Sequence, residues 1–143
     1  MVIKKEYYLY LAFLIAWVSL VGSLFFSEIL KYPPCDLCWY QRIAMYPLVV
    51  IFIVGIIKKT SDVHLYALPL AITGAIVAFY HNLLYYNILP ESAAPCIQGV
   101  SCTTKYIEFL GFITIPLLSF IGFLVIIACL ILYRNIPGKY FKI

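Results

Sequence analysis

Four long runs of apolar residues follow one another along the chain, separated by short polar segments. The runs cover about residues 7–27, 39–57, 65–89 and 110–133. Each run reaches or approaches the roughly 20 residues that an α-helix needs to cross about 30 Å of hydrocarbon. The pattern therefore predicts an all-α integral membrane protein, in which residues 1–143 form a single domain built as a four-helix transmembrane bundle.

The composition strengthens this prediction. Of the 143 residues, 65% are hydrophobic and only 11% are charged, and the mean hydropathy is +1.02, which excludes an ordinary soluble domain of this size. The first apolar run follows Lys4 and Lys5, as a signal peptide would. However, it is longer than a typical signal-peptide core and no small-residue cleavage site follows, so we interpret it as a helix of the bundle.

The cationic residues predict how the bundle is oriented. With a cytoplasmic N-terminus, most of the ten Lys and Arg residues lie on the cytoplasmic side, as the positive-inside rule requires. Both termini are then cytoplasmic, and the loops at residues 28–42 and 90–109 lie on the outer face. The net charge of +4 follows from this topology, and no basic patch indicates nucleic-acid binding. The inner group is Lys4, Lys5, Lys58, Lys59, Arg134, Lys139 and Lys142, and the outer group is Lys31, Arg42 and Lys105.

Four of the five cysteines fall on the outer face in this topology, namely Cys35, Cys38, Cys96 and Cys102. The outer face is the oxidising side, where disulfides form and persist. The fifth, Cys129, lies about 19 residues, or about 28 Å, into the last predicted helix, too far away to reach the others. We interpret Cys129 as an apolar residue that fills the bundle core.

The Cys35–Cys38 pair lies where one helix ends and the next begins. Pro33 and Pro34 end the first helix, and an apolar run starts directly after Cys38. Unpaired N–H groups at a helix N-terminus favour a thiolate over a thiol. Arg42 follows Cys38 at i+4 and is predicted to stabilise negative charge at the sulfur or on a bound electron acceptor. The alternative is that Arg42 only extends to the membrane surface.

His81 is predicted to lie about eight residues, or about 12 Å, below the outer end of the third helix. An ionisable residue at this depth is costly, and it is therefore a candidate functional residue. The alternative is that His81 only hydrogen-bonds a neighbouring helix and stabilises the bundle.

The two outer cysteine pairs are compatible with three kinds of site. A tetrahedral zinc site formed by all four is disfavoured, because Cys96 and Cys102 are loosely spaced and the compartment is oxidising. Two inert structural disulfides remain possible. A dithiol relay, in which one pair faces water and the other lies beside the membrane, is the favoured interpretation, and we predict no metal.

Two sequence segments resemble a known family. The string CDLCWYQR at residues 35–42, with MYPL at 45–48, resembles the signature of the DsbB family of membrane disulfide-generating oxidoreductases. The string PCIQGVSC at residues 95–102, followed by YI at 106–107 and GFITIP at 111–116, resembles the shorter BdbC-type branch of Gram-positive bacteria. The resemblance extends over nearly the whole chain.

The resemblance implies a thiol:quinone oxidoreductase in a bacterial plasma membrane, with its active site on the extracytoplasmic face. Such an enzyme reoxidises an extracytoplasmic DsbA-like (BdbD-like) thioredoxin-fold partner and passes the electrons to a membrane quinone, here menaquinone rather than ubiquinone. Cys96 resembles the cysteine that forms the mixed disulfide with the partner, and Cys102 the one that exchanges with Cys35. Cys38 resembles the thiolate that engages the quinone, with Arg42 stabilising the charge.

His81 is not part of the family signature, so its role in supplying or orienting a proton near the quinone is a local hypothesis. Two competing functions remain open. One is a non-catalytic membrane scaffold whose disulfides stabilise the outer loops. The other is an enzyme of the vitamin K epoxide reductase type, in which we expect the quinone-proximal cysteine pair late in the chain, whereas Cys35 and Cys38 precede the second helix.

Overall fold

The structure is a computed structural model that describes residues 5–90, 92, 94, 101 and 114–136. The described residues form four α-helices that are each long and apolar enough to cross a membrane, and this confirms the predicted all-α fold with four spans. A π-helical turn, η1, continues the first helix. The elements are α1 (Lys5–Leu24), η1 (Phe25–Ile29), α2 (Asp36–Lys58), α3 (Val63–Tyr85) and α4 (Ile115–Asn135).

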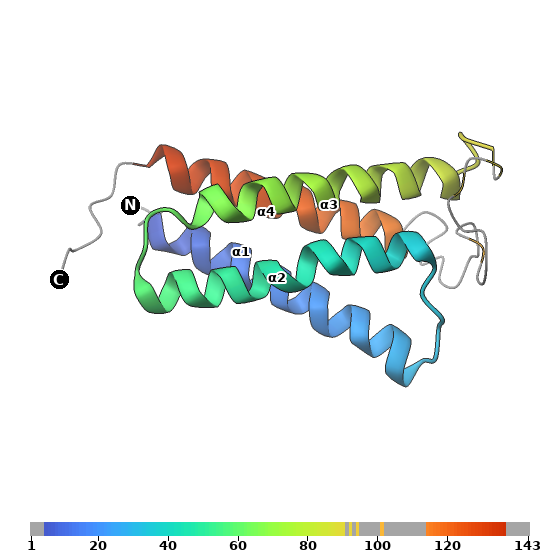
Figure 1. Ribbon diagram of the computed structural model, residues 1–143, viewed down its shortest axis with the longest axis horizontal. Coiled ribbons are helices and arrows are strands. Elements are labelled where there is room, and N and C mark those ends of the chain that lie inside the picture. The colour runs from blue at the N-terminus through green and yellow to red at the C-terminus, as the bar shows by residue number, and fades with distance from the viewer. Residues whose placement is uncertain (1–4, 91, 93, 95–100, 102–113, 137–143) are drawn as a thin grey trace.

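The four helices run along the long axis of the molecule (Figure 1). Helix α1 packs against α2 and α4, and α3 packs against the same two helices. The start of α1, the α2–α3 turn and the end of α4 lie at one end, whereas the start of α2 and the end of α3 lie at the other (Figure 1). This arrangement agrees with four successive crossings, and which membrane side each end faces stays a prediction.

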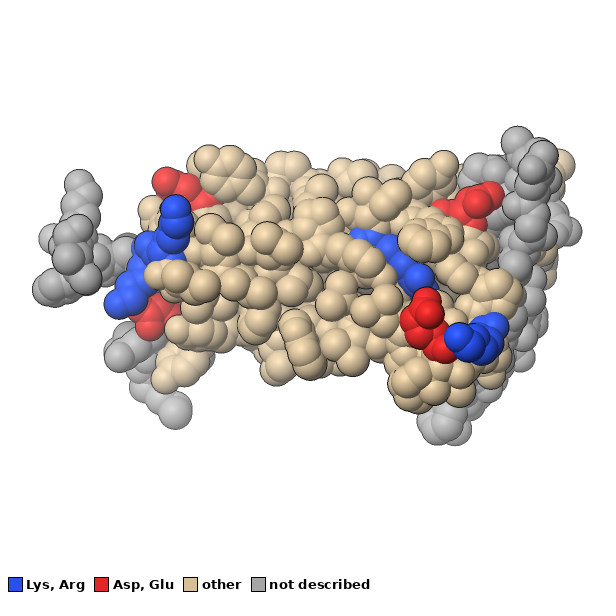
Figure 2. Space-filling model, turned by 60° about the horizontal axis from the view of Figure 1, so that its bottom comes forward, with Lys and Arg blue, Asp and Glu red and all other residues tan. Residues whose placement is uncertain are grey.

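The outer surface of the bundle is apolar. Side chains such as Leu14, Val18 and Ile76 are more than half exposed. On the face drawn in Figure 2, charged side chains gather mainly toward the two ends of the long axis, and uncharged surface covers most of the middle. A surface of this kind is unfavourable in water and is the one that hydrocarbon solvates.

Helix α2 begins at Asp36, three residues before the predicted start at about residue 39. Pro33 and Pro34 cannot continue the preceding helix, and Cys35 then takes the N-cap position with extended backbone angles. Asp36 places a negative charge in the first turn, where it complements the helix dipole. The predicted outer loop at 28–42 is therefore helical from Asp36 onward, and Cys38 lies within the first turn of α2.

The other helix ends also differ by a few residues from the prediction. Helix α3 ends at Tyr85 and not near residue 89, because Asn87 adopts a left-handed conformation with φ 55°. Helix α4 begins at Ile115, where the Thr114 hydroxyl accepts a hydrogen bond from the Leu117 N–H at 3.3 Å. The predicted start of this helix, residues 110–113, lies outside the described residues.

Close packing between α3 and α4 fixes the position of α3 in the bundle. A Cβ atom at Gly74 would overlap the ring of Phe123, so the absence of a side chain there lets the two helices approach. Nearer the other end of α3, the Asn82 amide nitrogen donates hydrogen bonds to the carbonyls of Ala78 at 2.7 Å and Pro116 at 3.0 Å. These contacts hold the last turns of α3, which carry His81, against the start of α4.

Candidate active site

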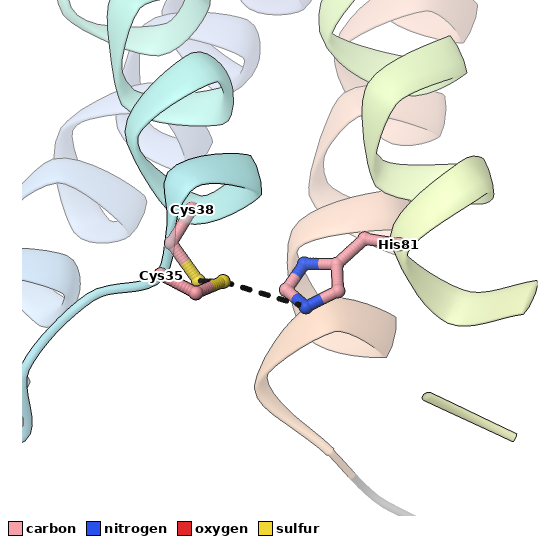
Figure 3. Close-up of side chains that lie close together, drawn as sticks. All are labelled: Cys35, Cys38 and His81. Carbon is pink, nitrogen blue, oxygen red and sulfur yellow. Dashed lines mark hydrogen bonds between the residues drawn. The ribbon is translucent and has the colours of Figure 1, made fainter. Parts of the chain in front are cut away.

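Cys35 and Cys38 lie together at the N-terminus of α2 (Figure 3). Their sulfur atoms are 3.2 Å apart and share a hydrogen bond, and both residues are free thiols. A disulfide needs sulfurs about 2.0 Å apart, so a small rotation of the two side chains would close the bond. Cys35 is buried and Cys38 is half-buried. The pair can therefore alternate between dithiol and disulfide without a backbone rearrangement.

His81 reaches this pair from α3 (Figure 3). Its Nε2 atom is 3.8 Å from the sulfur of Cys35, and only 2% of the residue is exposed. The sequence identified His81 as a candidate from its depth in the membrane, but gave no reason to place it beside Cys35, which is 46 positions away. The structure brings the buried imidazole and the two thiols into one group.

Gln41 adds a fourth polar side chain to the group. Its amide nitrogen is 3.0 Å from Nδ1 of His81, and the residue is buried. With the amide donating to Nδ1, the proton of a neutral imidazole lies on Nε2 and points toward Cys35. Sequence reasoning missed this residue as a site residue. The available signal was a buried amide in an otherwise apolar helix, one turn after Cys38.

The surroundings of Cys35 favour its thiolate form. The hydrogen bond with Cys38 lowers the pKa of the Cys35 thiol well below its ordinary value, and the hydrogen bond with His81 lowers it further. Burial opposes these effects but does not cancel them. A thiol with a lowered pKa forms a thiolate more readily and is also the better leaving group in thiol–disulfide exchange, so these contacts favour exchange at Cys35.

Arg42 lies one turn beyond Cys38, between α1 and α2. Its Nη2 atom donates to the carbonyl oxygen of Ser23 at 3.0 Å, and the guanidinium carbon is 5.3 Å from the centre of the Trp39 ring. The carbonyl is neutral, and among the described residues no carboxylate forms an ion pair with Arg42, so its positive charge contributes to the electrostatic field at the sulfur of Cys38. The guanidinium group therefore lies against α1 and the Trp39 ring, and the role of Arg42 stays a prediction.

Among the described residues, the one further cysteine, Cys129, does not join this group. Cys129 is buried in α4 within the main apolar core, whereas Cys35 belongs to a separate buried cluster with Leu37 and Leu84. This placement agrees with its interpretation as an apolar core residue. Cys96 and Cys102, the predicted second pair, lie outside the described residues, so their pairing and roles stay predictions.

The group also has the composition of a metal-ligand set. The sulfurs of Cys35 and Cys38 and a ring nitrogen of His81 lie within 4.8 Å of one another. Thiolates and imidazole are the ligands that soft and borderline metal ions prefer. From the sequence we considered only a metal site formed by four cysteines. The structure instead brings together two cysteines and a histidine as possible metal ligands.

Comparison with known proteins identifies the family that this chain resembles. Residues 5–133 match the family model described as Disulfide bond formation protein DsbB. The chain is 48% identical over 136 residues to the Bacillus anthracis protein named Probable disulfide formation protein C 2, covering 94% of each chain. It is 43% identical over 128 residues to Disulfide bond formation protein C of Bacillus subtilis (strain 168), covering 90% of this chain and 93% of that one. No solved structure matches the chain.

Proposed function

This chain belongs to the DsbB family of disulfide bond formation proteins, in its BdbC-type branch, and from that premise we propose that it is a membrane thiol:quinone oxidoreductase. In this proposal it reoxidises an extracytoplasmic DsbA-like, thioredoxin-fold partner and passes the electrons to a membrane quinone. The observation that carries the proposal is the Cys35–Cys38 pair, with sulfurs 3.2 Å apart at a helix N-terminus and a buried histidine against one of them.

The proposed reaction is a sequence of thiol–disulfide exchanges with balanced electrons. The partner's two thiols lose two electrons and two protons, and a disulfide between Cys96 and Cys102 is reduced by them. Cys102 then exchanges with Cys35, so that the Cys35–Cys38 disulfide becomes the dithiol. This dithiol finally forms its disulfide again by releasing two electrons and two protons to the acceptor in the membrane.

His81 and Gln41 support the proton transfers in this scheme. When the Gln41 amide presents its oxygen to Nδ1–H, Nε2, which is 3.8 Å from the Cys35 sulfur, is free to take the proton that Cys35 gives up, and the imidazole returns this proton when Cys35 becomes a leaving group. Gln41 fixes the ring orientation through Nδ1. We therefore assign His81 to general acid–base chemistry at Cys35, and Gln41 to positioning the imidazole.

The residues around Cys38 fit a quinone as the electron acceptor. A quinone accepts two electrons and two protons and becomes a quinol. The positive charge of Arg42 would stabilise negative charge that develops beside the Cys38 sulfur. Trp39 and Tyr40 are about half exposed on the same helix turns, as expected where a lipid-soluble molecule approaches from the membrane. We propose menaquinone as this acceptor, as the resemblance to the BdbC-type branch implies.

The location of this site on the extracytoplasmic face is part of the proposal. Four of the six described cationic residues lie toward the end that carries the α2–α3 turn, namely Lys5, Lys58, Lys59 and Arg134, and this supports the proposal because that end is then cytoplasmic. The cysteine pair lies at the opposite end of the bundle, where α2 begins (Figure 1). A DsbA-like partner outside the cell would then reach the loop that carries Cys96 and Cys102.

The decisive experiment is anaerobic mixing of the purified, oxidised protein with a reduced DsbA-type protein and a soluble menaquinone analogue. Quinone absorbance and free thiols are followed together. We expect one quinone to be reduced for each partner disulfide formed, and we expect the Cys38→Ser variant to lose this activity while staying folded. A protein that is a non-catalytic scaffold would consume no quinone and would tolerate Cys38→Ser, and that result would refute the proposal.

A further inference from the structure

We propose that the reduced site binds one Zn²⁺ ion through the sulfurs of Cys35 and Cys38 and Nε2 of His81, and that the bound ion blocks turnover. This inference rests on the proposed function, because the ligands are the dithiol form of the same redox pair. Zinc binding can nevertheless be measured without turnover, so the two proposals can fail separately.

The distances between the ligand atoms suit a tetrahedral zinc ion. The two sulfurs are 3.2 Å apart, and the Cys35 sulfur is 3.8 Å from Nε2 (Figure 3). With Zn–S bonds of about 2.3 Å and a Zn–N bond of about 2.0 Å, tetrahedral angles place two sulfurs about 3.8 Å apart and sulfur and nitrogen about 3.5 Å apart. The two sulfurs must therefore separate by about 0.6 Å, and the Cys35 sulfur and Nε2 must approach by about 0.3 Å. All the ligand atoms already lie within 4.8 Å of one another, so side-chain rotations can supply these changes.

The ligand atoms are also held in place by the fold. Cys35 is the N-cap of α2, Cys38 lies in its first turn, and His81 lies near the end of α3. Both Cys35 and His81 are buried, so little side-chain freedom remains to be lost when a metal binds. An ordinary surface Cys-x-x-Cys turn lacks such a third ligand from a neighbouring helix.

Gln41 provides the outer support that a metal-bound histidine requires. A histidine that ligates through Nε2 carries its proton on Nδ1 and donates it to a neighbouring acceptor. The Gln41 amide is already 3.0 Å from Nδ1, with its nitrogen toward the ring. A rotation of the amide by about 180° presents its oxygen to Nδ1–H and frees the Nε2 lone pair for zinc. Metal binding is thus coupled to the reorientation of a single side chain.

Charge balance and coordination number explain why the ion would inhibit. Two thiolates and a neutral imidazole compensate the charge of Zn²⁺, up to two thiol protons leave to water, and no electron is transferred. Sulfurs that are both bound to zinc cannot form a disulfide until the ion leaves. Three protein ligands leave the fourth position to water, which is typical of exchangeable sites and not of closed structural ones. Zinc would therefore hold the pair in its reduced state reversibly.

The test measures zinc affinity by competition with a fluorescent chelator. We would use the full-length Cys96→Ser/Cys102→Ser protein, in which the second pair cannot contribute ligands. The reduced protein should bind one zinc ion, and oxidation of Cys35 and Cys38 to the disulfide should weaken binding at least a hundredfold. His81→Ala should weaken binding at least tenfold, while Gln41→Glu should strengthen it about tenfold because a carboxylate accepts the Nδ1 proton better than an amide.

The matched controls are His64→Ala and Cys129→Ala, which remove a histidine and a cysteine outside the site. Both should leave zinc affinity unchanged. Equal affinity in the reduced and oxidised proteins, or an unchanged affinity in both His81→Ala and Gln41→Glu, would overturn the zinc site. Because Gln41→Glu keeps His81 in place, it remains informative if His81→Ala fails to fold.

Turnover of the native protein separates the two proposals. One equivalent of zinc should inhibit partner oxidation at least tenfold, and a chelator should restore it. Full turnover in the presence of bound zinc would refute inhibition but leave the proposed function intact. Tight, His81-dependent zinc binding by a protein that never reduces quinone would refute the proposed function and leave the metal site standing.

Discussion

The contact between His81 and Cys35 leads us to predict that His81 controls the pKa of the Cys35 thiol. In the native protein the pKa of Cys35 is lowered, first by the hydrogen bond with Cys38 and then by the hydrogen bond with His81. The substitution His81→Ala removes the second contribution and keeps the first. The pKa of Cys35 should therefore rise, and the thiolate should form only at higher pH.

The expected size of this effect follows from the 3.8 Å contact between Nε2 and the sulfur. A hydrogen bond to a charged group contributes about 1.5–3 kcal/mol, and this contact is long, so we take the lower end of that range. About 1.4 kcal/mol corresponds to one pKa unit, so the pKa of Cys35 should rise by about one unit. At a pH below both pKa values, the thiolate fraction should fall about tenfold, and the alkylation rate should fall about threefold because a thiolate of higher pKa is more nucleophilic.

The measurement is the rate of iodoacetamide labelling of Cys35 as a function of pH, in the reduced Cys96→Ser/Cys102→Ser protein. Peptide mass spectrometry separates labelling of Cys35 from that of Cys38. The inflection of the rate should move to higher pH in His81→Ala, whereas His64→Ala should leave it in place. An inflection unchanged in a folded His81→Ala protein would refute the electrostatic link, and His81 would then be a packing residue.

Three further predictions concern the acceptor side, the packing and the topology. Arg42→Ala should raise the apparent KM for the quinone analogue at least tenfold in steady-state assays while the pH dependence of Cys35 labelling stays the same, and unchanged quinone kinetics would remove Arg42 from the acceptor site. Gly74→Ala should lower the thermal unfolding temperature, at a cost of about 1–3 kcal/mol, because the new methyl group overlaps the ring of Phe123. Gly22→Ala is its matched control and should not destabilise, since no atom lies within 4 Å of the added carbon, so equal melting of the two variants would contradict the packing argument. In intact, reduced cells, a membrane-impermeant thiol reagent should label Cys96, and labelling only after lysis would reverse the predicted orientation.

The sequence by itself determined the features that depend on local physics. Apolar runs of membrane-spanning length gave the four helices, because the hydrocarbon core requires a continuous apolar segment with internally paired backbone groups. Pro33 and Pro34 fixed the Cys35–Cys38 pair at a helix N-terminus, since proline restricts its own backbone wherever it occurs. The family could also be recognised from strings of adjacent residues. None of these conclusions requires knowing how one helix packs against another.

Helix ends were less certain from sequence, because an apolar residue can end a helix or continue it. The predicted third helix ran to about residue 89, yet α3 ends at Tyr85 where Asn87 turns left-handed. The start of the second helix was also uncertain. It was predicted at about residue 39, but α2 begins at Asp36 and so includes Cys38 in its first turn. A shift of one turn matters here, because it decides how deep His81 lies relative to the thiols.

Only the tertiary structure decided which polar groups meet. Cys35 and His81 are 46 positions apart, and their contact depends on the rotation and height of α3 relative to α2. Those are fixed by the close approach of α3 to α4 at Gly74 and by the hydrogen bonds from Asn82 to α4. Packing between helices also brings Gln41 of α2 to His81 of α3. It likewise places the Ser23 carbonyl of α1 where Arg42 can donate a hydrogen bond to it. Hydrophobic periodicity specifies which residues enter the membrane, but side-chain packing between helices specifies which of them touch.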